Sequence, residues 1–237
     1  MIFGSGFFYC SNMNNTQQTA REIPVKVLLT AFLFLVSIFL FAFLAKVVVL
    51  GKKDLFDTTV FNFLHDRTTP LLIQLMKVIT FFGSAPFLFP AYVLLVVILL
   101  LKKQKRLALD IAIIGLSSDL LKLALKNSFK RHRPDLPLLE TLNSYSFPSG
   151  HALSSFIFFS IIIYVLWAEK LKPVWKWSLS VFLILFSMAI GISRIVLRFH
   201  YASDVMAGFC LGFTWVIFSL WLLNKIHFYI QNRRSKI

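Results

Sequence analysis

The sequence predicts an all-α integral membrane protein with six transmembrane helices and a short interfacial helix between the first two spans. Of its 237 residues, 58% are hydrophobic and only 15% are charged, whereas soluble proteins average about 45–50% apolar and about 25% charged residues. The mean hydropathy is +0.77. A soluble domain of this length could not bury so much apolar surface in one core, so most of the chain must contact lipid.

Long apolar runs predict the spans, because a helix needs about 20 residues to cross a hydrocarbon core of about 30 Å. The first run follows a polar tail, residues 1–25, and is too long for the core of a signal peptide, so we expect it to be retained. The six runs are residues 27–50, 85–101, 107–125, 148–168, 177–192 and 205–223.

The third run is the least apolar, because it carries Asp110, Asp119 and Lys122. Asp119 and Lys122 are spaced to pair on one helix face. Charges inside a membrane are often functional, so this pair either supports a site from below or contacts its ligand. Between the first two runs lies a mixed stretch whose segment 71–82 is apolar but too short to span. We expect this segment to be the interfacial helix.

The basic residues predict the orientation of the chain. There are 25 Lys and Arg residues against 10 Asp and Glu, a formal net charge of +15. Because these cations lie mostly in loops between apolar runs, no nucleic-acid partner is predicted. If the amino terminus is cytoplasmic, 13 of the cations lie on its side and ten on the other. The tight basic loops at 102–106 and 169–176 favour this orientation, which also places a basic tail, residues 225–237, in the cytoplasm.

Three short polar blocks occur where the hydropathy predicts membrane edges. Residues 126–134 read KNSFKRHRP, residues 148–151 read PSGH, and residues 193–204 read SRIVLRFHYASD. The first block follows the third predicted span and the second begins the fourth, so both lie at the connected ends of one hairpin. The third block connects the fifth and sixth predicted spans, which form the next hairpin. The topology therefore places all three blocks on the same membrane face.

The cations of these blocks favour a multiply charged anion as ligand. Lys126, Arg133 and Arg194 are expected to face one space. Arginine matches phosphate oxygens with paired N–H donors, and lysine adds a point charge. Ser149 and Gly150 open a helix, whose first backbone N–H groups lack internal partners and point at a bound anion.

Two histidines in the blocks suggest chemistry beyond binding. His200 and Asp204 are four residues apart, so they share one face at the start of a helix. The carboxylate can hold one ring nitrogen as a donor and leave the other as a nucleophile. His151 supplies a second imidazole, suited to proton transfer. The cysteines, Cys10 and Cys210, form neither a metal-binding pattern nor a disulfide framework.

Together the blocks resemble the signature of the type 2 phosphatidic acid phosphatase superfamily, which includes lipid phosphate phosphatases and bacterial membrane-bound diphosphate phosphatases. Eleven specified residues match in order and spacing, within the motif region 126–204. The six-span pattern extends the resemblance to most of the chain. Residues 1–237 are therefore expected to form a single membrane phosphatase domain.

The resemblance implies a role for each matching residue. His200 resembles the family's nucleophile, which forms a phosphohistidine, and Asp204 resembles the residue that orients it. His151 resembles the general acid that protonates the leaving oxygen and then acts as base for the hydrolytic water. The phosphate cradle is implied to consist of Lys126, Arg133, Arg194, Ser149 and Gly150, with Ser193 as its support. Such a cradle can replace a metal in phosphoryl transfer, so neither a metal nor another cofactor is expected.

The implied function is hydrolysis of a lipid phosphate or diphosphate at the extracytoplasmic face of a bacterial plasma membrane. Polyprenyl diphosphates such as undecaprenyl diphosphate, phosphatidylglycerol phosphate and phosphatidic acid are the candidate substrates. A lipid A phosphatase or a lipid-dependent phosphotransferase would carry the same motifs, so these alternatives stay open. Six spans argue against the soluble vanadium haloperoxidases, which share related blocks. An anion transporter or channel is disfavoured, because paired His and Asp are superfluous for binding and no inverted repeat is evident.

The remaining polar residues near the membrane edges are expected to have ordinary roles. Long cationic side chains at such edges usually extend towards lipid headgroups, and we interpret Lys130, Arg131 and Arg198 in this way. His132 and His227 are expected to be solvated. No oligomeric state is predicted.

Overall fold

The computed structural model describes residues 16–49, 55–134, 138 and 144–234, and no strand occurs among them. The predicted tail residues 1–15 and 235–237 lie outside the described residues. The helices are α1 (Thr16–Val49), α2 (Leu55–His65), α3 (Pro70–Phe81), α4 (Ala85–Leu101), α5 (Lys105–Phe129), α6 (Gly150–Ala168), α7 (Pro173–Val196) and α8 (Ala202–Arg234).

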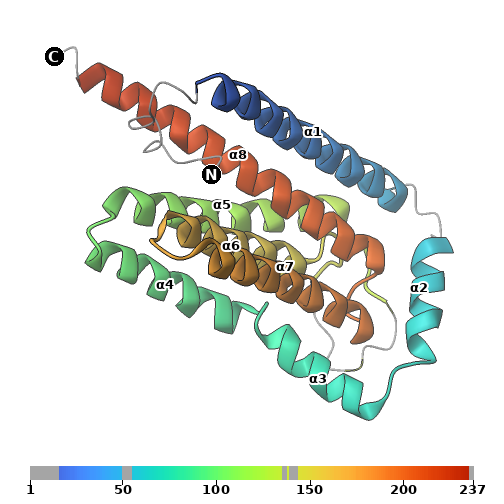
Figure 1. Ribbon diagram of the computed structural model, residues 1–237. Helices are drawn as coiled ribbons and strands as arrows, with labels where there is room; N and C mark the ends of the chain where they lie inside the picture. The colour runs from blue at the N-terminus through green and yellow to red at the C-terminus, as the bar shows by residue number, and fades with distance from the viewer. Residues whose placement is uncertain (1–15, 50–54, 135–137, 139–143, 235–237) are drawn as a thin grey trace.

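The long helices form an antiparallel bundle with α6 at its centre. Helix α6 packs against α4, α5, α7 and α8, whereas α1 packs mainly along α8. Helices α1, α4, α5, α6, α7 and α8 alternate in direction along the chain (Figure 1). The carboxyl ends of α5 and α7 therefore meet the amino ends of α6 and α8 at one end of the bundle, beside α2 and α3 (Figure 1).

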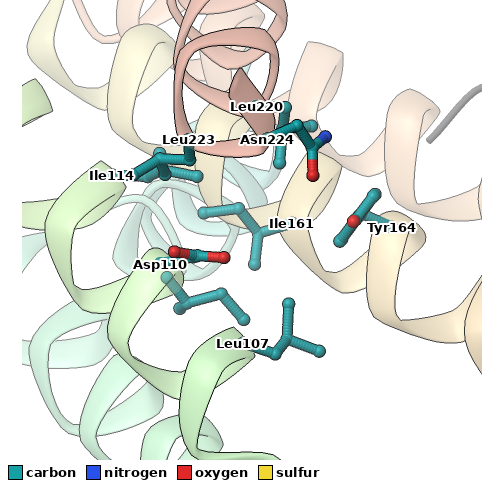
Figure 2. Close-up of a pocket in the computed structure, with 9 residues that line it drawn as sticks. Leu107, Asp110, Ile114, Ile161, Tyr164, Leu220, Leu223 and Asn224 are labelled. Carbon is teal, nitrogen blue, oxygen red and sulfur yellow. The ribbon is translucent and has the colours of Figure 1, made fainter. Parts of the chain in front are cut away.

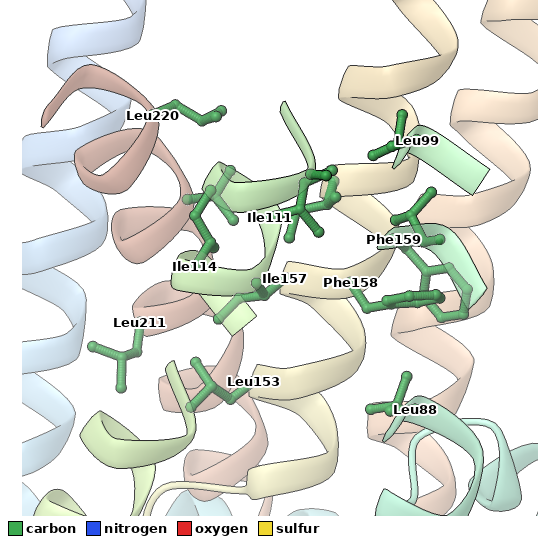
Figure 3. Close-up of a cluster of buried hydrophobic side chains, with 14 of the residues drawn as sticks. Leu88, Leu99, Ile111, Ile114, Leu153, Ile157, Phe158, Phe159, Leu211 and Leu220 are labelled. Carbon is green, nitrogen blue, oxygen red and sulfur yellow. The ribbon is translucent and has the colours of Figure 1, made fainter. Parts of the chain in front are cut away.

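The apolar core lies between these helices (Figure 3). Leu99 of α4, Ile114 of α5, Ile157 of α6, Ile190 of α7 and Leu211 of α8 all belong to it. Large apolar side chains also cover the outer faces of α1, α4 and α7, where they are exposed. Exposed apolar surface of this extent suits lipid rather than water.

Local sequence signals explain several helix ends near the polar blocks. Pro70 begins α3, at a position where the missing N–H costs no hydrogen bond. Thr69 precedes it and accepts the backbone N–H of Leu72 at 3.2 Å, a capping bond. Helix α5 ends at Phe129, and the left-handed conformation of the capping residue Lys130 (φ 47°) turns the chain away from the helix axis. Residues 131–133 can therefore reach α2 and α8.

Gly208 of α8 permits the close approach of α6 at the same end of the bundle. A Cβ atom at this position would lie 2.8 Å from the carbonyl oxygen of Ser149 and 3.1 Å from the Cβ of Ala152. Any side chain at position 208 would thus push the first turn of α6 away. Because glycine has none, that turn rests directly on α8.

The prediction of an all-helical membrane protein is confirmed, but the number of six spans is not. Among the described residues, five segments are long and apolar enough to cross a membrane: Val27–Val48, Pro70–Leu101, Gly150–Ala168, Pro173–Val196 and Ala202–Arg233. The third predicted span, 107–125, is absent from this set although α5 covers it. Its charged side chains, which include Asp110, Asp119 and Lys122, lower its hydropathy.

The region between the first two predicted spans contains two helices instead of one. Helix α3 occupies the segment that was predicted to be interfacial, and α2 is an additional helix that the apolar runs did not indicate. By hydropathy α3 and α4 form one candidate span of 32 residues. A position of α3 at the membrane interface therefore stays a prediction. Helix α8 continues to Arg234, so the described part of the predicted basic tail is helical.

A small cavity of about 10 Å³, lined by the residues that Figure 2 shows, lies at the end of the bundle that is remote from the polar blocks. Residues of α5, α6 and α8 line it, among them Asp110, Tyr164 and Asn224. Asp110 Oδ1 lies 2.8 Å from Nε2 of His227, so this histidine pairs with Asp110 and is not simply solvated. A cavity of this volume accommodates a water molecule at most.

Candidate active site

The three polar blocks meet at one end of the bundle, as the topology predicts. Arg133 Nη1 lies 3.2 Å from His200 Nε2, which joins the first block to the third. The backbone N–H of Ser149 donates to the carbonyl oxygen of Asp204 at 3.0 Å, which joins the second block to the third. Lys126 lies beside Gly150, because a Cβ atom there would be 3.8 Å from Lys126 Cε.

His200 lies in the short connection between α7 and α8, with only 2% of its surface exposed. Its Nδ1 lies 3.2 Å from the hydroxyl oxygen of Ser146 and 3.5 Å from Asp204 Oδ2. The Ser146 hydroxyl oxygen in turn lies 2.5 Å from Asp204 Oδ2. Ser146 therefore stands between the imidazole and the carboxylate, a position that the motif spacing does not reveal.

In the series His200–Ser146–Asp204, the number of protons that each group carries decides which group donates and which accepts. An ionised carboxylate only accepts, so the single hydroxyl proton of Ser146 points to Asp204. The oxygen of Ser146 can then accept a hydrogen bond from Nδ1–H of His200, which leaves the lone pair of the ring on Nε2. This ring nitrogen faces Arg133. The arrangement suits Nε2 to act as a nucleophile.

Burial keeps the imidazole of His200 neutral. It lowers the pKa of His200 from its ordinary value of 6.5 to about 3, and the nearby Arg133 and Arg194 cations act in the same direction. The hydrogen bond to Asp204 and the charge of that residue oppose this shift without cancelling it. A neutral imidazole is the form that has a free lone pair.

Asp204 is fully buried at the first turn of α8, and both of its oxygens are bound. Oδ1 accepts a hydrogen bond from Arg131 Nη1 at 2.6 Å. Oδ2 accepts from Ser146 and from the backbone N–H of Tyr201 at 2.9 Å. The expectation that Arg131 extends towards lipid headgroups is therefore wrong. Its side chain turns inward and pairs with Asp204 and with Asp57 of α2.

The cations of the predicted cradle are held in place by polar atoms around them. Lys126 Nζ donates to the carbonyl oxygen of Tyr145 at 2.6 Å. Arg133 donates to the carbonyl oxygens of Ser144, at 2.6 Å, and Phe199, at 2.7 Å. Such bonds fix the direction of both charges before a ligand arrives, which reduces the ordering cost of binding.

Arg194 is buried, and its Nη1 donates to the hydroxyl of Thr80 at 2.9 Å. The ring of Phe199 covers its guanidinium group, with Cζ 4.1 Å from the ring centroid. Arg194 Nε and the hydroxyl oxygen of Ser149 are both buried without a hydrogen-bond partner. Buried polar atoms normally have partners, so these two fit a ligand with several acceptor oxygens, such as a phosphate.

The other predicted site residues lie at the same end of the molecule. His151 is in the first turn of α6 next to Gly83, where a Cβ atom would be 3.2 Å from His151 Cδ2. Ser193 is buried, and its hydroxyl donates to the carbonyl oxygen of Ile190 within its own helix. Its side chain therefore stabilises the end of α7 and does not extend into the cradle.

The charged pair of α5 is formed, one turn below Lys126. Lys122 makes an ion pair with Asp119 and lies 3.4 Å from the hydroxyl of Ser154. A Cβ atom at Gly150 would be 3.0 Å from Lys122 Cδ, so the lysine reaches the start of α6. This position fits support of the site from below. Its direct contact with a ligand stays a prediction.

Among the described polar residues around the site, the sequence motifs did not select Asp57, Thr80, Arg131 or Ser146. Ser146 precedes the second block by two residues, and this proximity was the only local signal. Asp57 and Thr80 come from α2 and α3, far from the blocks in sequence. Their contribution depends on packing that no periodicity indicates.

Comparison with known proteins identifies the family. The family model described as the PAP2 superfamily matches residues 107–228, which contain all three polar blocks. Phosphatidylglycerophosphatase B of Bacillus subtilis is 32% identical over 145 residues, which cover 60% of this chain and 71% of the relative.

Two further relatives match shorter shares of their own length. The protein named bacitracin transport permease protein BcrC of Bacillus licheniformis is 37% identical over 94 residues, 40% of this chain and 41% of the relative. Dolichyldiphosphatase 1 of Dictyostelium discoideum is 32% identical over 149 residues, 54% of this chain and 62% of the relative.

The fold is also similar to that of a solved structure. The crystal structure of a transmembrane PAP2-type phosphatidylglycerolphosphate phosphatase from Bacillus subtilis superimposes with a TM-score of 0.70 and 25% identity. The match covers 80% of this chain and 96% of that one. Because the family match includes more than half of the chain and every polar block, the chain belongs to the PAP2 superfamily and is a multi-pass membrane phosphatase.

Proposed function

We propose that this phosphatase hydrolyses a lipid phosphate or diphosphate through a phosphohistidine on His200, without a metal ion. One observation carries the proposal: a neutral imidazole, fixed through Nδ1, presents Nε2 to Arg133 beside the buried unpaired atoms of Arg194 and Ser149. A nucleophile and a set of phosphate donors are thus held in one place.

In the first step Nε2 of His200 attacks phosphorus, and the bond to the leaving oxygen breaks. His151 gives its proton to that oxygen. Lys126, Arg133 and Arg194 neutralise the charge that spreads over the other phosphoryl oxygens, the main requirement of phosphoryl transfer. The Asp204 carboxylate, acting through Ser146, stabilises the positive charge that the phosphorylated imidazole acquires.

In the second step a water molecule attacks phosphorus while His151 removes one of its protons. The N–P bond breaks, inorganic phosphate leaves, and His200 returns to its neutral form. His151 is then protonated again and ready for the next leaving group. The same residue can serve as acid and then as base, because the two steps are chemically reversed.

The proposed substrates carry a hydrocarbon tail that stays in the bilayer while the headgroup reaches the end of the bundle. Two of the relatives are named as a phosphatidylglycerophosphatase and a dolichyldiphosphatase. Phosphatidylglycerol phosphate, phosphatidic acid and a polyprenyl diphosphate, such as undecaprenyl diphosphate, are therefore the candidates that we propose to test.

For the topology we propose six spans, with α5 as the third, in one domain with both termini in the cytoplasm. The alternating directions of α1 and α4–α8 support this proposal (Figure 1). A charged helix can cross the membrane when its polar side chains face the bundle or a polar cavity. In this arrangement the catalytic end faces the extracytoplasmic side of a bacterial plasma membrane.

The deciding experiment is phosphate release by the purified protein from a panel of lipid phosphates, with EDTA present throughout. We expect release to continue in EDTA and to be inhibited by vanadate, which mimics the five-coordinate phosphoryl group. Activity that disappears in EDTA and returns with Mg²⁺ would contradict metal independence. Adding acceptor lipids separates hydrolysis from phosphotransfer, since a transferase would lose phosphate release and gain a phosphorylated lipid.

A second measurement identifies the nucleophile. Rapid quenching with a radiolabelled substrate should trap label on His200, and His200→Ala should abolish both the label and turnover. The matched control is His132→Ala, which removes an exposed histidine of the first block. Label on any other residue would contradict the assignment of His200.

A further inference from the structure

Arg131 and Asp57 are not among the eleven motif residues, yet they bind the carboxylate that accompanies His200. Arg131 Nη1 donates to Asp204 Oδ1 at 2.6 Å, and Nη2 donates to Asp57 Oδ2 at 2.8 Å. One guanidinium group therefore bridges two carboxylates. The side chains of Asp57 and Asp204 are only 4% and 0% exposed, and that of Arg131 is 18% exposed.

Asp57 also binds the first turn of α8, which carries Asp204. Its Oδ1 accepts the backbone N–H of Ser203 at 2.8 Å, and its Oδ2 accepts the Ser203 hydroxyl at 2.5 Å. Free N–H groups and the helix dipole both favour a negative charge at this position. A residue of α2 thus caps α8 directly beside the catalytic carboxylate.

The charges of this cluster depend on one another. Buried carboxylates are costly unless a cation and hydrogen bonds compensate them. The two carboxylates hold the pKa of Arg131 above its usual value although burial acts in the opposite direction, so the guanidinium stays charged. The ring of Tyr201 covers it, with Cζ 4.2 Å from the ring centroid. Without Arg131, two buried carboxylates would lack their common cation.

The two oxygens of Asp204 have separate tasks. Arg131 binds Oδ1, whereas Ser146 and the backbone of Tyr201 bind Oδ2. Fixing Oδ1 prevents the carboxylate from rotating, and this keeps Oδ2 in line with Ser146 and His200. A small rotation would lengthen the bonds that orient the nucleophile, and a misplacement of about 1 Å can cost about 10²-fold in rate.

We propose that Arg131 and Asp57 are positioning residues, which fix the Asp204 carboxylate and, through Ser146, the tautomer and direction of His200. This inference rests on the proposed phosphohistidine mechanism. Helix α2 is then a part of the catalytic apparatus, although it carries none of the motif residues.

The test compares Asp57→Asn, Arg131→Lys, Arg131→Gln and the Asp57→Asn/Arg131→Lys double variant in nanodiscs. The matched control is Glu169→Gln, which removes the Lys102–Glu169 ion pair (2.6 Å) at the remote end of the bundle. The first measurement is the ¹⁵N NMR spectrum of the His200 imidazole without substrate, which reports its tautomer. The second is kcat and KM for phosphate release from the best lipid phosphate of the panel.

We expect Asp57→Asn and Arg131→Gln to lower kcat about 10- to 100-fold with KM changed less than twofold, and to alter the His200 tautomer signal. Arg131→Lys keeps the charge but not the double bridge, so it should recover part of the loss seen in Arg131→Gln. The double variant should lose little more than Arg131→Lys alone, because both residues act through one carboxylate. Glu169→Gln should match the wild type.

Two results would overturn the proposal: a kcat equal to that of Glu169→Gln, or a rise in KM with an unchanged His200 spectrum. If Asp57→Asn does not fold, the Arg131 variants decide the question by the same criteria. The proposed function fails separately if the wild type labels no histidine. The NMR comparison needs no turnover, so the positioning proposal is still judged in that case.

Discussion

At the scale of single residues, Ser146 connects the proposed nucleophile His200 to the Asp204 carboxylate. His200 and Asp204 share a helix face, as their spacing predicts, but their nearest polar atoms are 3.5 Å apart. The hydroxyl of Ser146 lies 3.2 Å from the imidazole and 2.5 Å from the carboxylate. The effect of the carboxylate therefore reaches the imidazole mainly through a neighbouring serine.

Ser146→Ala should slow phosphoenzyme formation roughly 10- to 100-fold, since a hydrogen bond to a charged group contributes about 1.5–3 kcal/mol. The matched control is Ser128→Ala, which removes an exposed hydroxyl that donates to the carbonyl oxygen of Ala124. Rapid-quench measurement of the first turnover checks this expectation. A rate equal to that of Ser128→Ala would show that Asp204 acts on His200 directly.

The pH dependence of His200 follows from its burial. Its pKa is lowered from 6.5 to about 3, so the imidazole should stay neutral at every pH well above 3. A ¹⁵N NMR titration of His200 should therefore show no protonation between about pH 5 and 8. A midpoint near 6.5 would mean that water reaches the imidazole and that burial does not control its charge.

The roles of His151 and Arg194 can be distinguished by comparing substrates with different leaving groups. If His151 protonates the departing oxygen, His151→Ala should be most harmful for alkyl monophosphates, whose oxygen leaves poorly without a proton. Aryl and diphosphate substrates need less help, and general acids contribute about 10²–10⁴-fold. Arg194→Gln should slow all of them by similar factors, because it stabilises the shared phosphoryl group. The measurement is the first-turnover rate for each of the three substrate classes. If His151→Ala slows all three classes by the same factor, another residue is the general acid.

At the scale of helices, the site depends on how closely α6 packs on α8. Gly208 allows this contact, because a Cβ atom there would lie 2.8 Å from the backbone oxygen of Ser149. Ser149 belongs to the predicted cradle, so the same contact supports stability and function. Helix α2 contributes in a similar way, since Asp57 caps α8.

Gly208→Ala should destabilise the protein by about 1–3 kcal/mol through overpacking, and it should lower activity because α6 must move. Gly115→Ala is the matched control. Both changes gain the same helix propensity, but the nearest atom to a Cβ at position 115 is the side-chain Cε1 of Tyr92, at 3.2 Å, and not a backbone atom. Thermal unfolding in detergent and phosphate release check both variants. Equal stability and activity would show that α6 does not rest on position 208.

At the scale of the whole molecule, the number of spans determines where the chain ends lie. With α5 as a span, an even number of crossings would place both termini on one side of the membrane. Helix α1 begins and helix α8 ends at the same end of the bundle as the loop between α4 and α5 (Figure 1). Protease protection of tags at both ends and in residues 102–104 should give one common side in sealed vesicles. Protection of one terminus but not the other would show an odd number of crossings, with α5 or α3 placed differently from our proposal.

The sequence by itself determined the fold class, the family and the residues of the polar blocks. The apolar composition can be read without knowledge of any tertiary contact, and it predicts a helical membrane protein. The motif spacing can also be read directly from the sequence, because hairpins between consecutive spans bring the blocks together. Only the tertiary structure decided which groups join these residues: Ser146 between His200 and Asp204, and Arg131 between Asp204 and Asp57. Asp57 is 74 residues from Arg131 and 146 from Ser203. Such contacts arise from the packing of α2 against α8, and hydropathy, which averages over neighbours in sequence, contains no information about them.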